Sequence, residues 1–127
     1  MKRTLIVMIA VFLFLAGCGD TKVDNTYHQI THEEAKNMMD TQEVIILDVR
    51  EQDEFEAGHI SGAILLPLGT ISEETAAAVI PEKDSMVLVY CRSGNRSKTA
   101  SGVLTEFGYT NIYEFGGIHT WPYEVEK

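Results

Sequence analysis

Cysteine is scarce in this chain of 127 residues, which has two of them, Cys18 and Cys91, and no Cys-x-x-Cys pair. The missing pair argues against a thioredoxin-type oxidoreductase, whose redox centre is built on that motif. A structural zinc site needs several thiolate or imidazole ligands at regular spacing. The four histidines have no such spacing, and Cys91 has no second thiol near it in the sequence. The composition therefore indicates neither a zinc centre nor a redox disulfide.

Basic residues are also few. The chain has 10 Lys and Arg against 19 Asp and Glu, which is a formal net charge of −9. Binding of nucleic acid needs a basic face that neutralises phosphates, so the balance argues against that function. The acidic residues are spread along the chain and most simply form a solvated surface. No repeat or low-complexity tract is present, and about a hundred residues suffice for one domain with one core.

The longest apolar run lies at the N-terminus, where Lys2 and Arg3 precede an unbroken apolar stretch over residues 5–15. A bilayer-spanning helix takes about 20 apolar residues, so this run is too short to span, but it fits the core of a secretory signal. The sequence Leu-Ala-Gly stands directly before Cys18 and resembles the lipobox of bacterial lipoproteins.

This resemblance implies that residues 1–17 are a signal peptide and that Cys18, the new N-terminus, receives a diacylglyceryl group and fatty acyl chains such as palmitate. Residues 18–26 are polar and are expected to form the lipidated N-terminus and a short tether. The domain over residues 27–127 would then face the extracytoplasmic side of a bacterial cell membrane. Ordinary signal cleavage that leaves a free Cys18 is the alternative. With Cys18 lipidated, Cys91 has no partner for an internal disulfide.

Strand-like and helix-like segments alternate from Thr31 onward, where Thr31 and Glu34 form a capping-box pattern that opens a helix. Continuous apolar runs of this length are typical of strands covered on both faces. The alternation predicts an α/β fold in which a central parallel sheet of about five strands has helices on both faces. The expected strands are residues 44–47, 63–66, 86–90 and 111–114, and the later helices are residues 51–56, 72–79 and 97–107. A turn at Gly116-Gly117 is expected next, followed by Trp121 in the core.

Cys91 follows one of these strands and precedes the last helix, so we expect its thiol at the carboxyl end of a parallel strand. Backbone N–H groups of the loop and the N-terminus of the helix point toward such a position. A helix N-terminus or a neighbouring arginine lowers the pKa of a cysteine thiol from about 8.5 to roughly 3.5–7.5, and Arg92 and Arg96 are expected to supply that charge. Gly94 is expected to adopt a left-handed conformation that turns the loop amides inward. The pattern predicts a nucleophile in an anion cradle.

The loop Cys91-Arg-Ser-Gly-Asn-Arg96 resembles the active-site loop of rhodanese-like sulfurtransferases, in which a cysteine and an arginine bracket four residues. Other recurring segments of that family stand in the same order along the chain. They are residues 46–51, Glu54-Phe55, residues 58–63, and Gly116-Gly117 followed by Trp121. The resemblance covers residues 27–127 and implies a single rhodanese-like domain with a three-layer fold.

The same resemblance implies sulfur transfer through Cys91. The thiolate attacks the outer sulfur of an anionic donor such as thiosulfate and keeps it as a persulfide until a thiol or cyanide accepts it. Loop amides would stabilise the persulfide, and Arg96 would bind the charged end of the donor. No metal ion or organic cofactor is implied. The expected substrate-binding residues are Arg92, Ser93, Gly94, Asn95 and Arg96. Ser93 stands where animal thiosulfate:cyanide enzymes have a basic residue, which leaves the donor open.

Asp48, Arg50 and His59 are the other polar candidates. Asp48 and Arg50 follow the strand expected at residues 44–47, at the sheet edge that receives Cys91. We expect this pair to fix loops by hydrogen bonds rather than to react. His59 lies in a Gly-His-Ile segment that is structural in rhodanese-like proteins. A role for His59 as general base for Cys91 is the alternative.

Two other function classes fit parts of this pattern. Phosphatases and arsenate reductases use similar loops, some on the same fold, but they bracket five residues between cysteine and arginine. The loop from Cys91 to Arg96 brackets four, so it should be too small to enclose a tetrahedral phosphate. A non-enzymatic module that binds a partner, or carries a persulfide for another protein, would keep the same residues.

Overall fold

The computed structural model describes residues 26–127, in which five parallel strands form one sheet in the order β1-β6-β5-β2-β4. Two further strands, β3 and β7, pair antiparallel in a small second sheet that the sequence analysis did not predict. The strands are β1 (His28–Gln29), β2 (Ile45–Asp48), β3 (His59–Ile60), β4 (Ile64–Leu65), β5 (Val87–Cys91), β6 (Ile112–Gly117) and β7 (Val125–Glu126). The α-helices are α1 (His32–Thr41), α2 (Gln52–Ala57), α3 (Glu73–Val79) and α4 (Asn95–Glu106), and short 3₁₀ helices occupy Leu68–Thr70 and Ile118–Thr120.

Strand β5 lies in the middle of the sheet and is buried along its whole length. It pairs in parallel with β2, where Asp48 lies opposite Tyr90, and with β6, where Gly117 lies opposite Cys91. The carboxyl ends of the three strands therefore meet at one edge of the sheet, which is where parallel α/β proteins place their functional groups.

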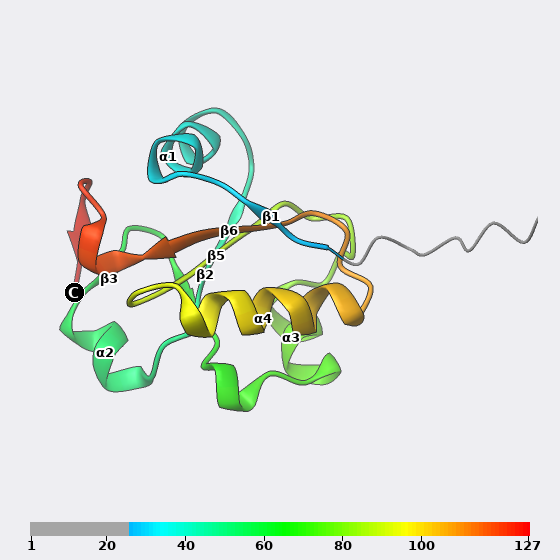
Figure 1. Ribbon diagram of the computed structural model, residues 1–127. Coiled ribbons are helices and arrows are strands. Elements are labelled where there is room, and N and C mark those ends of the chain that lie inside the picture. Colours follow the sequence, from blue (N-terminus) through cyan, green and yellow to red (C-terminus); the bar gives the residue numbers. More distant parts are fainter. Residues whose placement is uncertain (1–25) are drawn as a thin grey trace, which may run out of the picture.

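Helices cover both faces of the sheet, α1 on one side and α3 and α4 on the other (Figure 1). Side chains of β5 alternate between these layers, as the two-residue period of a strand requires. Leu88 and Tyr90 pack in the α1 layer, whereas Val89 and Cys91 pack in the α3–α4 layer. The predicted three-layer α/β fold is confirmed, and the thiol of Cys91 faces α4.

The expected helices and strands are present, with changes at two ends. Helix α4 begins at Asn95, two residues earlier than expected, because the left-handed Gly94 precedes its first turn directly. Strand β6 continues through Gly116 and Gly117, which the sequence analysis placed in a turn. A register shift in β5 next to Cys91 lets Cys91 pair with Gly117, so the strand extends further than predicted.

The capping box at Thr31 and the burial of Trp121 are both as predicted. Thr31 accepts a hydrogen bond from the backbone N–H of Glu34, and the Glu34 carboxylate accepts one from the N–H of Thr31. Trp121 packs in the α1 layer with its ring centroid 5.4 Å from that of Phe115. Trp121 is therefore a core residue.

The predictions about the signal peptide, the tether and lipid at Cys18 concern residues 1–25, which lie outside the described residues. They stay predictions. Within residues 26–127, the helices are all too short or too polar to cross a bilayer.

Candidate active site

Cys91 is the last residue of β5, and its thiol is 1% exposed, at the floor of a tight loop. Gly94 closes this loop with a φ of +111°, the left-handed conformation that the sequence predicted. Its backbone N–H donates a hydrogen bond to the Cys91 sulfur at 3.0 Å. Any residue with a Cβ is strained at this φ, so glycine is required for the amide to point inward.

Hydrogen bonds lower the pKa of the Cys91 thiol. Burial raises the pKa of the thiol, but hydrogen bonds from the Ser97 hydroxyl and from the backbone N–H groups of Ser97, Gly94 and Ser93 outweigh it, and the net pKa lies below its ordinary value. The sequence analysis expected the loop amides, the N-terminus of the following helix and the arginines Arg92 and Arg96 to lower this pKa. The largest favourable contributions come from the Ser97 hydroxyl and the loop amides.

Arg96 is not free in this structure but forms a bidentate ion pair with Glu54. The two terminal guanidinium nitrogens lie 2.6 and 2.8 Å from the two carboxylate oxygens. The hydrogen bonds from Arg96 lower the pKa of Glu54 to about 2 against the opposing effect of burial. Glu54 comes from the first turn of α2, so this pair fastens the start of α4 to a helix far away in sequence.

The sequence analysis named Glu54 only as part of a family segment and missed it as the partner of Arg96. Neither spacing nor periodicity connects two residues on separate helices. Only the convergence of α2 and α4 near the same sheet edge brings them together, which follows from the fold and not from the local sequence.

Arg92 has an exposed side chain, whereas its backbone carbonyl is firmly held. The carbonyl oxygen accepts a hydrogen bond from the backbone N–H of His119 at 3.2 Å and lies 2.6 Å from the His119 Nδ1, which therefore donates to it. Gly117 lies directly beneath the same peptide, so that a Cβ at Gly117 would stand 1.9 Å from the carbonyl oxygen of Arg92. The loop thus rests on the glycine end of β6.

Ser93 and Asn95, the remaining predicted loop residues, are exposed. The Ser93 N–H is among the groups that lower the pKa of Cys91, and Asn95 is the first residue of α4. All the predicted loop residues therefore surround Cys91 in the structure. The basic side chains of the loop lie on its outer side, and its backbone N–H groups face the Cys91 sulfur.

Ser97 and Glu114 form a second row of polar groups beneath the loop. The Ser97 Oγ lies 3.3 Å from the Cys91 Sγ and 2.7 Å from the Glu114 Oε1. Sequence analysis missed Glu114, which stands in the apolar strand β6 and is buried. An acidic residue at an inward-facing position of a buried strand is the signal that could have found it.

Asp48 and Arg50 are buried and paired, in line with the expectation of a structural role. Arg50 donates to both carboxylate oxygens of Asp48 at 2.7–3.1 Å and to the carbonyl oxygen of Gly58 at 2.7 Å. Burial lowers the pKa of Arg50, but its contacts with Asp48 and Tyr90 raise it more. The Tyr90 hydroxyl donates to Asp48 at 2.6 Å and accepts from the N–H of Ile60 at 3.0 Å. This network ties β2 and β5 to the α2–β3 segment.

Both ring nitrogens of His59 are engaged away from Cys91. Nδ1 lies 2.9 Å from the carbonyl oxygen of Phe55, and Nε2 lies 3.4 Å from the carboxylate of Glu126. The ring also stacks on Phe55 at a centroid distance of 3.7 Å. These contacts fit a structural role for His59 better than that of a general base.

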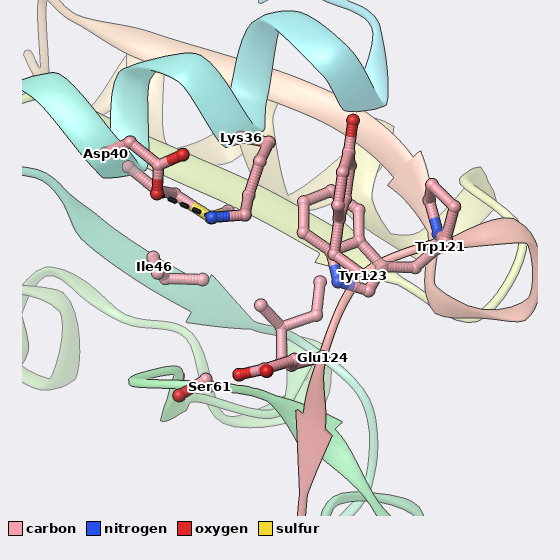
Figure 2. A pocket seen from close by; sticks show the side chains of 10 residues that line it. Lys36, Asp40, Ile46, Ser61, Trp121, Tyr123 and Glu124 are labelled. Carbon is pink, nitrogen blue, oxygen red and sulfur yellow. Dashed lines mark hydrogen bonds and ion pairs between the residues drawn. The ribbon is translucent and has the colours of Figure 1, made fainter.

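A hollow of about 780 Å³ lies on the opposite side of the sheet from the Cys91 thiol, between α1 and the C-terminal segment (Figure 2). Its lining includes the Lys36–Asp40 ion pair of α1 on one side and Tyr123 and Glu124 on the other. No group of three or more His, Cys, Asp or Glu side chains suited to a metal ion exists within residues 26–127.

Comparisons with known proteins agree with this geometry. A family model described as the rhodanese-like domain matches residues 31–123. Thiosulfate sulfurtransferase GlpE of Coxiella burnetii is 36% identical over 96 residues, which are 75% of this chain and 87% of that protein. Thiosulfate sulfurtransferase PspE of Escherichia coli is 40% identical over 72 residues, which are 57% of this chain and 68% of that protein.

Among solved structures, a "rhodanese with anions from E. coli" aligns with a TM-score of 0.63 at 33% identity and covers 67% of this chain and 99% of that chain. The family model covers most of the described residues, and the solved structure shares the fold. The chain belongs to the rhodanese-like domain family.

Proposed function

We propose that this protein is an extracytoplasmic, lipid-anchored sulfurtransferase that moves sulfane sulfur through a persulfide on Cys91. The Cys91 thiolate attacks the outer sulfur of thiosulfate or a similar anionic donor. A new S–S bond forms to Cys91, the bond between the two donor sulfurs breaks, and sulfite leaves with its electron pair. A thiolate or cyanide then takes the outer sulfur and releases the Cys91 thiolate, so the enzyme is unchanged after two displacement steps.

One observation carries this proposal: the Cys91 sulfur lies at the floor of a loop whose Gly94 N–H points at it from 3.0 Å. Such donors stabilise negative charge on sulfur, and with the Ser97 hydroxyl they bring the pKa of the thiol below its ordinary value. An anionic thiolate and an anionic persulfide benefit from the same environment. The similarity to two proteins named thiosulfate sulfurtransferase supports the same reaction class.

The size of the loop favours sulfur transfer over phosphate chemistry. The four residues between Cys91 and Arg96 form a cradle one residue smaller than a phosphatase loop. This difference in size disfavours a tetrahedral phosphate.

A persulfide carrier is the second candidate function, and the Arg96–Glu54 pair is the observation that favours it. Because Glu54 offsets the charge of Arg96, the mouth of the site is less attractive to a dianion than the loop sequence suggests. A less charged donor, such as a protein persulfide, would meet less repulsion from Glu54. A persulfide carrier and a sulfurtransferase would both form the Cys91 persulfide. They would differ in the molecules that deliver the sulfur and receive it.

Mass spectrometry tests the persulfide directly. In a Cys18→Ser chain, Cys91 is the sole thiol, so incubation with thiosulfate should add the mass of one sulfur atom, and cyanide or a reductant should remove it. Cys91→Ser in the same background is the matched control and should gain nothing. An unchanged mass with thiosulfate, polysulfide and an organic persulfide alike would refute both candidate functions. Hydrolysis of an aryl phosphate that depends on Cys91 would instead establish a phosphatase.

The membrane anchor is tested separately in a bacterial host. The resemblance of Leu-Ala-Gly-Cys18 to a lipobox leads us to expect that labelled fatty acid enters the wild-type chain and that the protein sediments with membranes. Cys18→Ser should lose the label. If the variant still carries the label, lipid attachment at Cys18 is wrong, whatever the outcome of the persulfide measurement.

A further inference from the structure

Glu114 is a buried carboxyl group beside the catalytic loop that the proposed cycle does not yet use. The residue is 3% exposed, and within the described part of the chain no basic side chain forms an ion pair with it. Its Oε1 accepts hydrogen bonds from the Ser97 hydroxyl at 2.7 Å and from the N–H of Gly116 at 2.8 Å.

Ser97 connects this carboxyl group to the nucleophile. Its Oγ lies 3.3 Å from the Cys91 Sγ, and its single hydroxyl hydrogen has the Glu114 Oε1 as its nearest acceptor. A hydroxyl can accept one hydrogen bond while it donates another. The thiol can therefore donate to Ser97 while Ser97 donates to Glu114, which makes a continuous chain of two hydrogen bonds.

We propose that Glu114 receives the proton of the Cys91 thiol through the Ser97 hydroxyl when the reactive thiolate forms. The S–H bond breaks and its proton moves to the Ser97 Oγ, while the original hydroxyl proton moves to the Glu114 Oε1. The products are a thiolate, an intact hydroxyl and a carboxylic acid, so no proton leaves the site and no electrons change hands. This inference rests on the proposed function only in that Cys91 is the nucleophile.

The same chain explains how one hydroxyl serves both states of the cysteine. Before transfer, Ser97 accepts from the thiol and donates to Glu114. After transfer, the hydroxyl donates to the thiolate and accepts from the protonated carboxyl, so its hydrogen bond adds to that of the Gly94 N–H. When an acceptor removes the outer sulfur of the persulfide, the carboxyl can return the proton to Cys91 by the reverse path. Glu114 is thus a positioning and proton-holding residue, acting through Ser97.

Other charged or titratable groups surround the loop without interrupting this chain. Arg96 of α4 interacts with Cys91 and is offset by Glu54 of α2 and by Glu51, the N-cap residue before α2, and the His119 ring holds the carbonyl of Arg92. From α1, the His32 Nε2 lies 3.6 Å from the place of a Cβ on Gly116. Among the described residues, none of these groups takes part in the hydrogen bonds that link the Cys91 sulfur to the Glu114 carboxyl through Ser97.

The ultraviolet absorbance of the thiolate, followed against pH in the full chain with Cys18→Ser, tests the relay. Two groups that share a proton titrate in two macroscopic steps, so thiolate should appear in two steps in this parent chain. Glu114→Gln keeps a hydrogen-bond acceptor for Ser97 but takes up no proton, and its thiolate should appear in a single step. Ser97→Ala should also give a single step, at higher pH, because the thiolate loses a donor.

Ser101→Ala is the matched control, because Ser101 lies one turn later in α4, is fully buried and has a hydroxyl without a hydrogen-bond partner. It should keep the two-step titration. A single step in the parent that coincides with that of Glu114→Gln would overturn the relay, as would two steps in Ser97→Ala. If Glu114→Gln fails to fold, Ser97→Ala decides alone.

Persulfide mass measured on the same samples separates this inference from the proposed function. Two steps without any persulfide would support the relay and refute sulfur transfer. A persulfide together with a single titration step in the parent chain would support sulfur transfer and refute the relay.

Discussion

Glu54 is the residue through which the charge of the donor can be tested apart from the rest of the site. Its carboxylate holds both terminal nitrogens of Arg96, so an incoming anion meets a guanidinium that is already paired. Glu54→Gln removes one negative charge, and glutamine at this position of α2 still completes the capping box with Glu51. We therefore expect the variant to use thiosulfate better than the wild type.

The size of this gain follows from Coulomb's law. An anion on the open edge of the Arg96 guanidinium would stand about 6 Å from the Glu54 carboxylate, and at a dielectric constant of about 80 each unit of its charge then costs about 0.7 kcal/mol. The water-like constant sets the smallest gain, because the two side chains are only 32% and 26% exposed and a lower constant would enlarge it. Dianionic thiosulfate should gain at least about 1.4 kcal/mol, roughly tenfold in kcat/KM, and a monoanionic thiosulfonate at least about threefold.

Steady-state kinetics with both donors measures this difference. The gain should appear mainly as a lower KM and should shrink as salt is added, because the Debye length is about 8 Å at 0.15 M ionic strength. Glu56→Gln is the matched control, since Glu56 lies on the same helix, is exposed and bonds to Gln52 instead of the loop. A loss of kcat/KM with both donors would refute the reasoning, because it would show that Glu54 holds Arg96 in its active position. Equal gains with both donors would show a looser loop and no effect of charge.

Three further predictions follow from the same contacts. Arg96→Ala should lower kcat/KM with thiosulfate by roughly ten- to a hundredfold, since a charge-assisted hydrogen bond contributes about 1.5–3 kcal/mol. Steady-state kinetics should show a much smaller loss of kcat/KM with a less charged donor. Equal losses with both donors would show that Arg96 shapes the loop. The pKa of Glu54 falls from an ordinary 4.5 to about 2 in the folded protein, so its contribution to stability is present above pH 4.5 and is lost as the pH falls toward 2. Denaturant unfolding at several pH values should therefore show the free energies of unfolding of Glu54→Gln and wild type converging in that window. A difference in unfolding free energy that stays constant with pH would contradict the pairing. Tyr90→Phe removes one of the donors to Asp48, which keeps Arg50, and leaves the N–H of Ile60 without its partner. It should reduce the free energy of unfolding by about 1–3 kcal/mol while the Cys91 persulfide still forms.

Most of the helices and strands could be predicted because they have local patterns of their own. The buried strand β5 is continuously apolar, and α1 opens with a capping box at Thr31. The edge strand β1 could not be predicted, because it has two residues and becomes a strand only by pairing with β6. The small sheet of β3 and β7 could not be predicted either, because His59–Ile60 and Val125–Glu126 are two-residue strands without a pattern of their own. They become strands only because the fold brings the C-terminus back to the segment after α2.

The loop around Cys91 could be predicted for a similar reason, since the residues from Cys91 to Arg96 are contiguous. The conformation of Gly94 followed from the need to turn an amide inward, and the structure confirms it. Glu54 and Glu114 could not be found in this way. Each reaches the loop from a separate element, α2 or β6, so their contacts depend on how helices and strands pack at the sheet edge.

Gly117 tests whether the position of the loop sets the acidity of the thiol. Its backbone is extended, with φ of −134°, so glycine is not needed there for conformation. It is needed for space, because a Cβ would stand 1.9 Å from the carbonyl oxygen of Arg92 and 2.6 Å from the Cα of Ser93. Gly117→Ala must therefore displace this peptide by more than an ångström, which should pull the adjacent loop amides away from the sulfur and raise the pKa of the thiol.

We expect alkylation of Cys91 at neutral pH to slow several-fold in Gly117→Ala, because less thiolate is present. Gly102→Ala is the control, since within residues 26–127 no atom outside the adjoining turns of α4 lies within 4 Å of the place of its Cβ, and alanine is the better residue inside α4. It should leave alkylation unchanged and stabilise the fold by about 0.5–1 kcal/mol. If Gly117→Ala folds and its thiol titrates as in the wild type, the amides near Cys91 keep their place without support from β6. The loop sequence alone would then account for the acidity of the nucleophile.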